Sequence, residues 1–257
     1  MSMNIRAIKR RAGSILGSRM GAAVLGMFAV FLTQMAGSYL AAVFFSGTDL
    51  WSLIFYQIFL FIISLITAVF SAGLSYMYLN MAREQEYSLA DLLYFFRSHP
   101  DRVIVASFVM ALLNMLVSIP YYYYGFTASP GDTLESQSNY LIMITALLLL
   151  SQVLYIVVTI PLAMTYYLLA DDLNLQGMAS LKASARMMRG HIKEYILLLL
   201  SFVPWMILSV FTLYLGLIWL IPHMNMSETV FYLRLSEIRQ TETSNTPELP
   251  EQENDNI

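Results

Sequence analysis

The sequence contains no cysteine, and few of its residues carry a charge. The absence of cysteine excludes disulfide bonds, thiolate metal sites and a cysteine nucleophile. Charged residues make up 12% of the chain, whereas about 25% are charged in a typical soluble domain. Hydrophobic residues make up 58%, and the mean hydropathy is +0.63. This composition excludes an ordinary soluble domain and predicts a protein that crosses a membrane several times.

The chain also lacks the short motifs that mark common catalytic and cofactor sites. No GxSxG, GxGxxG or Walker pattern is present. The histidines His99, His191 and His223 share no metal-ligand spacing such as HExxH. We therefore expect no metal and no cofactor, and catalysis has no support at the level of individual residues.

Long uncharged runs predict an all-α membrane bundle of six transmembrane helices. A helix rises about 1.5 Å per residue and the hydrocarbon core is about 30 Å thick, so about 20 apolar residues can span it. Residues 1–240 are expected to form a single membrane domain, and residues 241–257, which are acidic and lack periodicity, a disordered cytoplasmic tail. The predicted spans are residues 21–45, 51–79, 103–121, 140–169, 195–214 and 216–238.

The positions of the basic residues favour six spans over five. If the chain turns near Leu215-Gly216 and crosses twice, all 14 Lys and Arg fall on one side of the membrane. The positive-inside rule is then obeyed, and both termini are cytoplasmic. The alternative has five spans, with residues 196–221 as one tilted helix and residues 223–240 as an interfacial helix. It avoids placing polar residues of the last segment near mid-membrane.

Two basic segments are predicted to form amphipathic helices on the cytoplasmic surface. Residues 4–17 carry apolar residues at helical spacing and basic residues mostly around the other side. In the second segment, four basic residues recur at spacings of four, three and four, which predicts one helix face. That face would anchor the chain or bind anionic lipid phosphate, at ~1 kcal/mol for each basic residue. The four are Lys182, Arg186, Arg189 and Lys193, opposite Met178, Leu181, Ala185 and Met188.

A candidate intramembrane polar cluster lies in the last predicted span. It consists of His223, Asn225 and Glu228. A carboxylate in low dielectric could relay protons or bind a cation, although the alternative is a hydrogen bond between helices.

Three residues near the end of the fourth predicted span also bear on function. Pro161 predicts a kink whose freed carbonyl must be satisfied by Thr or by a neighbouring helix. Asp171 and Asp172 could coordinate a cation, or remain solvated or cap the next helix.

The segment from residue 180 to 232 resembles the bacterial integral-membrane family called domain of unknown function 975. Weaker likeness covers residues 82–96 and the N-terminal helix, so that it extends over most of residues 1–235. Two departures are His223, where the family usually has Tyr, and Pro204, where Gly is common before the Trp. The family carries no assigned activity, and a more distant likeness, of architecture alone, is to the membrane domain of some glycerophosphodiester phosphodiesterases. The similar parts are SARMMRGH (184–191), LLSFVPW (199–205), GLIWLIP (216–222) and Phe231-Tyr232.

The sequence thus leaves three function classes open for a multi-pass protein of a bacterial plasma membrane. We favour a non-catalytic component that binds anionic lipid headgroups or membrane-protein partners. The alternatives are a small transporter or channel subunit, and an enzyme acting on lipid or peptide through Asp171, Asp172 and Glu228. Nucleic acid is not an expected partner.

Overall fold

The structure is a computed structural model, and it describes residues 4–47 and 49–244. Within these ranges the chain forms helices and connecting turns but no β-strand, which confirms the predicted all-α class. The helices are α1 (Ile5–Leu16), α2 (Met20–Phe44), α3 (Leu50–Ala82), η1 (Leu89–Leu93), α4 (Tyr94–Arg97), α5 (Pro100–Val117), α6 (Ile119–Thr127), α7 (Leu134–Thr159), η2 (Ile160–Leu162), α8 (Thr165–Asp171), α9 (Gly177–Met188), α10 (Ile192–Leu200), α11 (Val203–Phe211) and α12 (Leu217–Ser244).

Five helical segments of the described chain are long and apolar enough to cross a membrane. This supports a helical membrane bundle. The last helix, α12, is not among the five, although the chain does reverse direction in the turn at residues 212–216, where the six-span prediction placed it. The five are Met20–Phe44, Leu50–Ala82, Pro100–Val117, Leu134–Asp171 and Ile192–Phe211.

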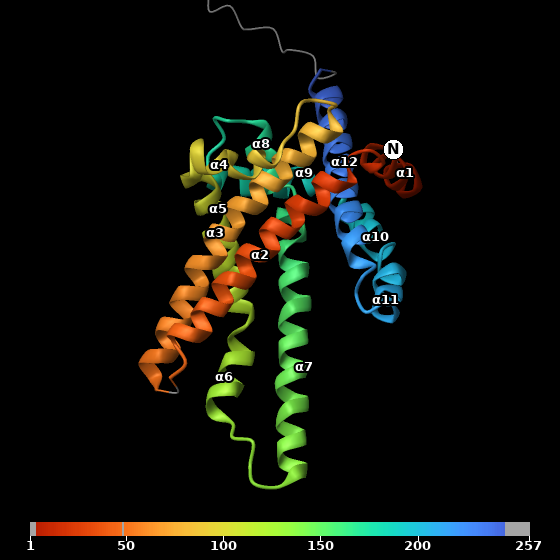
Figure 1. Ribbon diagram of the computed structural model, residues 1–257. Helices are drawn as coiled ribbons and strands as arrows, with labels where there is room; N and C mark the ends of the chain where they lie inside the picture. Colours follow the sequence, from red (N-terminus) through yellow and green to blue (C-terminus); the bar gives the residue numbers. More distant parts are fainter. Residues whose placement is uncertain (1–3, 48, 245–257) are drawn as a thin grey trace, which may run out of the picture.

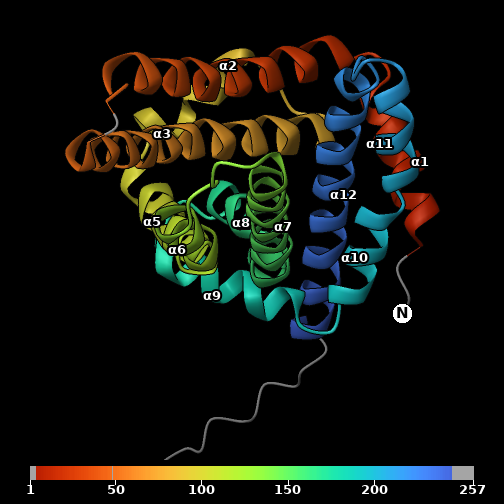
Figure 2. The same ribbon diagram turned by 90° about the horizontal axis from the view of Figure 1, so that it is seen from below.

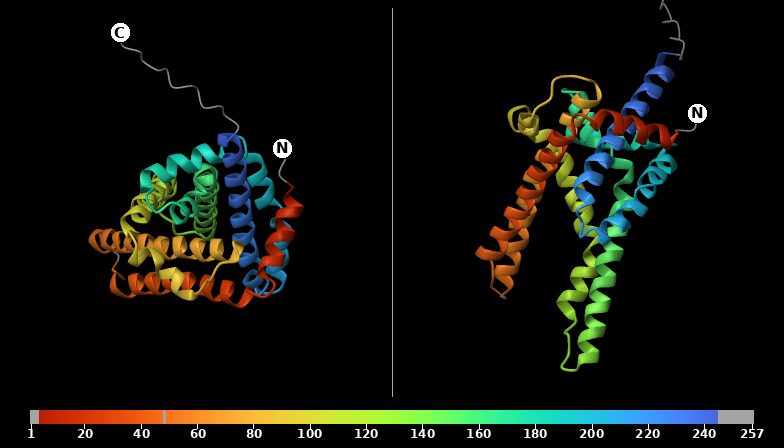
Figure 3. Two further views of the ribbon diagram at one scale, coloured as in Figure 1. Left: turned by 90° about the horizontal axis from the view of Figure 1, so that it is seen from above. Right: turned by 45° about the vertical axis from the view of Figure 1, so that its right-hand side comes forward.

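The helices form a platform from which three hairpins project (Figure 1). The platform consists of α1, α4, α8 and α9, which lie at one end of the molecule. The α2–α3 pair and the α6–α7 pair extend from it in the same general direction, whereas α10 and α11 with the returning α12 reach only part of the way along α7 (Figures 1 and 3). Both α1 and the C-terminal end of α12 therefore lie at the platform end.

The core lies at the platform, where α12 is packed between other helices. Seen from below, α12 runs between α1 and the end of α3 (Figure 2), in agreement with its contacts to α1, α2 and α3. The largest buried side chains here include Tyr78, Phe202, Phe231 and Tyr232. By contrast, large apolar residues along α2, the first half of α3 and α7 are exposed. Their exposure fits helices that are surrounded by lipid.

The N-terminal helix forms where the spacing predicted it. Asn4 caps α1, because its side-chain oxygen accepts a hydrogen bond from the Ala7 amide. The apolar residues Ile8, Ala12 and Leu16 are buried, and α1 makes its contacts mainly with α12. The apolar face of α1 thus packs against protein, whereas its amphipathic pattern predicted a helix on the membrane surface.

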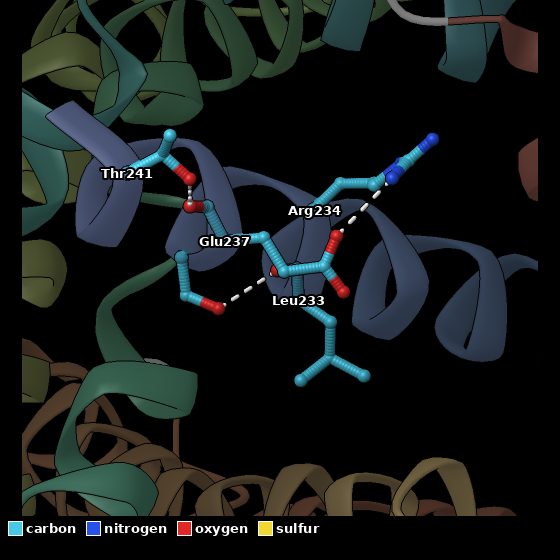
Figure 4. Close-up of polar contacts among 5 residues, drawn as sticks. Leu233, Arg234, Glu237 and Thr241 are labelled. Carbon is cyan, nitrogen blue, oxygen red and sulfur yellow. Dashed lines mark hydrogen bonds and ion pairs between the residues drawn. The ribbon is translucent and has the colours of Figure 1, made fainter.

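The last helix is longer than expected. Thr241–Ser244, assigned to the disordered tail from sequence, belong to α12, and the rest of the predicted tail lies outside the described residues. Figure 4 shows the side-chain contacts along this end: Arg234 pairs with Glu237 at 3.2 Å, and the Thr241 hydroxyl donates to the Glu237 carbonyl over 2.9 Å. Such exposed contacts each add only a few tenths of a kcal/mol, roughly, to helix stability.

The predicted kink at Pro161 is present, and a neighbouring helix satisfies the broken backbone. The long helix ends at Thr159, and η2 separates α7 from α8. The Ser184 hydroxyl, from α9, donates to the Pro161 carbonyl over 2.9 Å and accepts from the Met164 amide at 3.1 Å. Ser184 is fully buried, so no water can replace it at either group.

We expect Ser184→Ala to lower the free energy of unfolding by about 1–3 kcal/mol, because it leaves a buried donor and a buried acceptor without partners. Thermal unfolding in maltoside micelles would measure this loss. Ser180→Ala is the matched control, since Ser180 is also buried on α9 but bonds only to the Gly177 carbonyl of its own helix. Equal losses in the two variants would contradict the bridging role of Ser184.

Candidate functional site

All fourteen Lys and Arg residues lie in the platform elements or at the ends of helices that adjoin them (Figures 1 and 3). We call this end of the molecule the basic end. The described residues of the turns at the opposite tips, 45–47 with 49 and 128–133, contain no Lys or Arg but contain Asp49 and Asp132. The charges are therefore separated along the long axis of the bundle. The basic residues are Arg6, Lys9, Arg10, Arg11, Arg19, Arg83, Arg97, Arg102, Lys182, Arg186, Arg189, Lys193, Arg234 and Arg239.

The four basic residues predicted to share one helix face do not lie on one helix. Lys182 and Arg186 are on α9, which ends at Met188, and Lys193 is in the first turn of α10. Gly190 lies between them with φ at +91°, a left-handed conformation that glycine adopts without strain and that redirects the chain. The prediction of a continuous basic helix is therefore wrong. All four side chains are nevertheless exposed on the α9–α10 segment, and they form no ion pair within the described part of the chain.

The apolar face predicted for this segment is only partly buried. Leu181 and Met188 lie in the core, but Met178 is 49% exposed. The first turn of α9 is fixed instead by Gly177, where an added Cβ would overlap the Arg102 carbonyl of α5.

One further cation is partly buried, which the sequence did not predict. The Lys9 ammonium donates to the carbonyl and the hydroxyl of Ser201, at 3.1 and 3.3 Å, and lies 4.1 Å from the centre of the Phe202 ring. Burial lowers the pKa of Lys9 from its ordinary value. Lys9 therefore fastens α1 to the turn between α10 and α11, although its position in a run of basic residues suggested a solvated charge.

The predicted intramembrane cluster is divided between two sides of α12. His223 lies beside the Phe202 and Trp219 rings and within 3.4 Å of the Ser227 hydroxyl. Glu228 accepts a hydrogen bond of 3.1 Å from the Tyr195 hydroxyl on α10.

The third member of that cluster contributes its backbone. The Asn225 carbonyl accepts from the Tyr167 hydroxyl at 3.4 Å and from the Thr229 hydroxyl at 2.9 Å. His223, Asn225 and Glu228 consequently do not form a single site, and the carboxylate is paired with tyrosine.

Asp171 joins three helices at the basic end. Its carboxylate forms an ion pair of 2.6 Å with Arg83, at the end of α3, and accepts a hydrogen bond of 2.7 Å from Tyr232 of α12. Tyr232 stacks on Tyr167, with 5.3 Å between ring centres. The bond to Asp171 raises the pKa of the Arg83 guanidinium. Asp171 thus links three helices. A bound cation is not needed there, because Arg83 already supplies the positive charge and Tyr232 a hydrogen-bond donor.

Asp172 forms hydrogen bonds with other residues than Asp171 does. Its side chain accepts a hydrogen bond of 2.9 Å from the Asn174 amide, and its carbonyl accepts from Arg102. The adjacent carboxylates Asp171 and Asp172 therefore serve separate contacts.

A cavity of about 210 Å³ lies between α5, α7, α8 and α10. We call it the tyrosine groove, because Tyr155, Tyr166 and Tyr195 line it. The Tyr166 hydroxyl is within hydrogen-bond distance of Ser107, at 3.1 Å, and Tyr195 is the residue that donates to Glu228. None of Asp171, Asp172 and Glu228 lines the groove, which removes the support for an enzyme site built on them there. The other lining residues are Met110, Ile156, Thr159, Ile160, Leu162, Ala163 and Leu199.

The groove could not be found from the sequence. Its three tyrosines come from separate segments of the chain, and tyrosine is frequent at membrane interfaces for reasons unrelated to ligands. The one signal available was the run of Tyr and Thr residues around the Pro161 kink.

Comparisons with known proteins give a family but no activity. A family model described as "Protein of unknown function (DUF975)" matches residues 1–239. No curated protein and no solved structure matches the chain, and the likeness to glycerophosphodiester phosphodiesterase membrane domains is therefore not supported.

Proposed function

Because the chain belongs to the DUF975 family of proteins of unknown function, we propose a function from its structure alone. The protein is a non-catalytic component of a bacterial plasma membrane that binds anionic lipid headgroups through its basic end. The observation that carries this proposal is the collection of all fourteen Lys and Arg at one end of the bundle. A cytoplasmic leaflet with anionic lipids attracts such a surface, and the positive-inside rule then places both termini in the cytoplasm.

The three hairpin tips support a membrane placement in which one hairpin is re-entrant. The α2–α3 and α6–α7 tips carry Asp49 and Asp132, which suit water on the far side. The α11–α12 tip, residues 211–216, instead contains no charged residue and exposes large apolar side chains. They are Phe211, Leu213, Tyr214 and Leu215, which are 81%, 84%, 61% and 67% exposed. Lipid, and not water, is the favourable surrounding for such a tip.

The backbone of this third tip is also suited to lipid. Inside a bilayer each amide must find a partner within the protein. The Tyr214 amide donates to the Ser209 carbonyl over 2.8 Å, and the Gly216 amide to the Thr212 hydroxyl over 3.2 Å. The amides of Leu213, Leu215 and Leu217 are also bonded within the turn. In this placement four helical segments cross the membrane, and α10–α11 with α12 enters from the basic end and returns to it.

The lipid-binding proposal predicts a loss of selectivity when charge is removed from the α9–α10 segment. We expect a variant with Lys182, Arg186, Arg189 and Lys193 all changed to Gln to lose at least about tenfold in preference for phosphatidylglycerol over phosphatidylcholine. The reason is that each basic residue near an anionic surface contributes ~1 kcal/mol, shared with the remaining cations of the basic end. Native mass spectrometry of lipids retained from mixed micelles would measure the preference.

A charge-retaining variant is the matched control for this experiment. It exchanges Lys for Arg, and Arg for Lys, at the same four positions, and its preference should stay within about threefold of the parent if net charge is what attracts the headgroups. An unchanged preference in the Gln variant would contradict the proposal.

A further inference from the structure

Glu228 is connected to the tyrosine groove through Tyr195. Tyr195 lines the groove and donates to the Glu228 carboxylate over 3.1 Å. Glu228 is partly buried and forms no ion pair within residues 4–47 and 49–244. A carboxylate withdrawn from water is costly unless a cation or several donors compensate it. The single hydroxyl of Tyr195 does not neutralise the carboxylate, and a positively charged ligand could do so.

The residues that line the groove also favour a positively charged ligand. Tyr155 comes from α7, Tyr166 from α8 and Tyr195 from α10, so tyrosines from three helices line one small space. Aromatic rings attract ammonium ions through their electron-rich faces, and several rings together recognise quaternary ammonium groups. The remaining lining is largely aliphatic. The tyrosine lining, the aliphatic surface and a carboxylate that is hydrogen-bonded to one of the lining tyrosines together match an ammonium group attached to an alkyl chain.

The size and position of the groove limit the ligand further. Its volume of about 210 Å³ lies below the roughly 300–1,000 Å³ of pockets for drug-sized molecules. A small head group with a few carbons therefore fills it. Ile156 lines the groove and is also 53% exposed on α7, a helix long and apolar enough to cross the membrane. The groove is accordingly reached from the lipid side of the bundle.

We propose that the tyrosine groove binds an amine-headed amphiphile from the bilayer, with Tyr155, Tyr166 and Tyr195 around its ammonium group and Glu228 as the counter-charge. The groove is lined by none of the fourteen Lys and Arg residues of the basic end, to which headgroups of the opposite charge would bind. The two proposals therefore stand or fall independently.

Calorimetric titration of the full chain in neutral maltoside micelles tests this proposal. The probe is octyltrimethylammonium, with octyl glucoside as the chain without a charge and tetramethylammonium as the charge without a chain. We expect saturable binding of the probe that is at least tenfold tighter than that of either control compound. Glu228→Gln should weaken the probe at least tenfold, whereas Glu237→Gln, which alters an exposed carboxylate on the same helix, should change its affinity less than twofold.

Three results would overturn the site. They are the absence of saturable binding by octyltrimethylammonium, equal binding of octyl glucoside, and unchanged affinity in Glu228→Gln. Should Glu228→Gln fail to fold, Tyr155→Leu takes its place, because Tyr155 lies on α7 away from the core helix α12. Removing this wall should weaken the probe threefold or more, and an unchanged affinity would count against the proposal. The four-residue Gln variant of the α9–α10 segment should bind the probe as the parent does.

Discussion

Replacement of Gly73 by alanine is expected to destabilise the protein by about 3 kcal/mol or more, a large share of the roughly 5–15 kcal/mol by which folded proteins are stable. A Cβ added to Gly73 would overlap the Leu92 carbonyl oxygen and lie 2.6 and 2.7 Å from its carbonyl carbon and Cα. Overpacking against side chains costs about 1–3 kcal/mol, and here the obstacle is backbone that no rotamer change can move. Thermal unfolding and size-exclusion profiles in detergent would measure the loss.

The segment that meets Gly73 has little freedom to withdraw. Ser88 and Asp91 form a reciprocal capping box at the start of η1, and Asp91 also accepts a hydrogen bond of 3.3 Å from Asn80 on α3. Leu92 itself is only 3% exposed. The chain from α3 to α4 is therefore held against Gly73 at several points, so that the strain cannot be relieved by a loop movement.

Gly21→Ala is the matched control for this prediction. Gly21 lies in the first turn of α2, and an added Cβ would meet no heavy atom within 4 Å. Alanine is favoured over glycine in helices by up to about 1 kcal/mol, so this variant should be as stable as the parent or slightly more stable. Similar stability of Gly73→Ala and Gly21→Ala would show that α3 and η1 do not approach as closely as described.

The importance of Gly73 illustrates which information the sequence carries. Hydropathy predicted the span that contains it, because burial in lipid depends on composition and length alone. The need for glycine arises from η1, a segment that crosses α3 only after the chain has turned back. The cap at Ser88 depends on nearby residues alone, whereas the surface on which the capped turn rests depends on how the whole chain folds.

Other differences could have been foreseen from helical geometry. His223 and Glu228 are five residues apart, and at about 100° per residue they project some 140° from each other, too far apart for one site. Likewise, Gly190 follows a basic run, which is a signal for the end of a helix. The tyrosine groove could not have been foreseen in this way, because its lining residues are brought together only by the packing of α7, α8 and α10.

Single cysteines are expected to report three different environments along the chain. The parent has no cysteine, so each variant carries one reactive thiol and no background. With a membrane-impermeant maleimide, Asp132→Cys should be labelled in intact cells, and Gln240→Cys only after the cells are permeabilised. Leu213→Cys should remain unlabelled in both conditions until detergent is added, because its position at the apolar tip keeps the thiol in lipid, where the reagent and the thiolate are both excluded.

The three positions separate the alternatives for the membrane placement. Labelling of Leu213→Cys in intact cells would mean that the α10–α11 segment emerges on the far side, giving the six full crossings favoured from sequence. Labelling of Gln240→Cys in intact cells would invert the bundle, which would place the basic end outside the cell and remove the basis for binding cytoplasmic anionic lipid. Protection of Leu213 together with internal Gln240 requires a hairpin that returns within the bilayer, since α10–α11 and α12 then begin and end on the same side. In that case the polar pair Tyr195–Glu228 lies where the hairpin enters the membrane, at the depth of the lipid headgroups. A polar head group is stable at this depth, whereas an acyl chain is not.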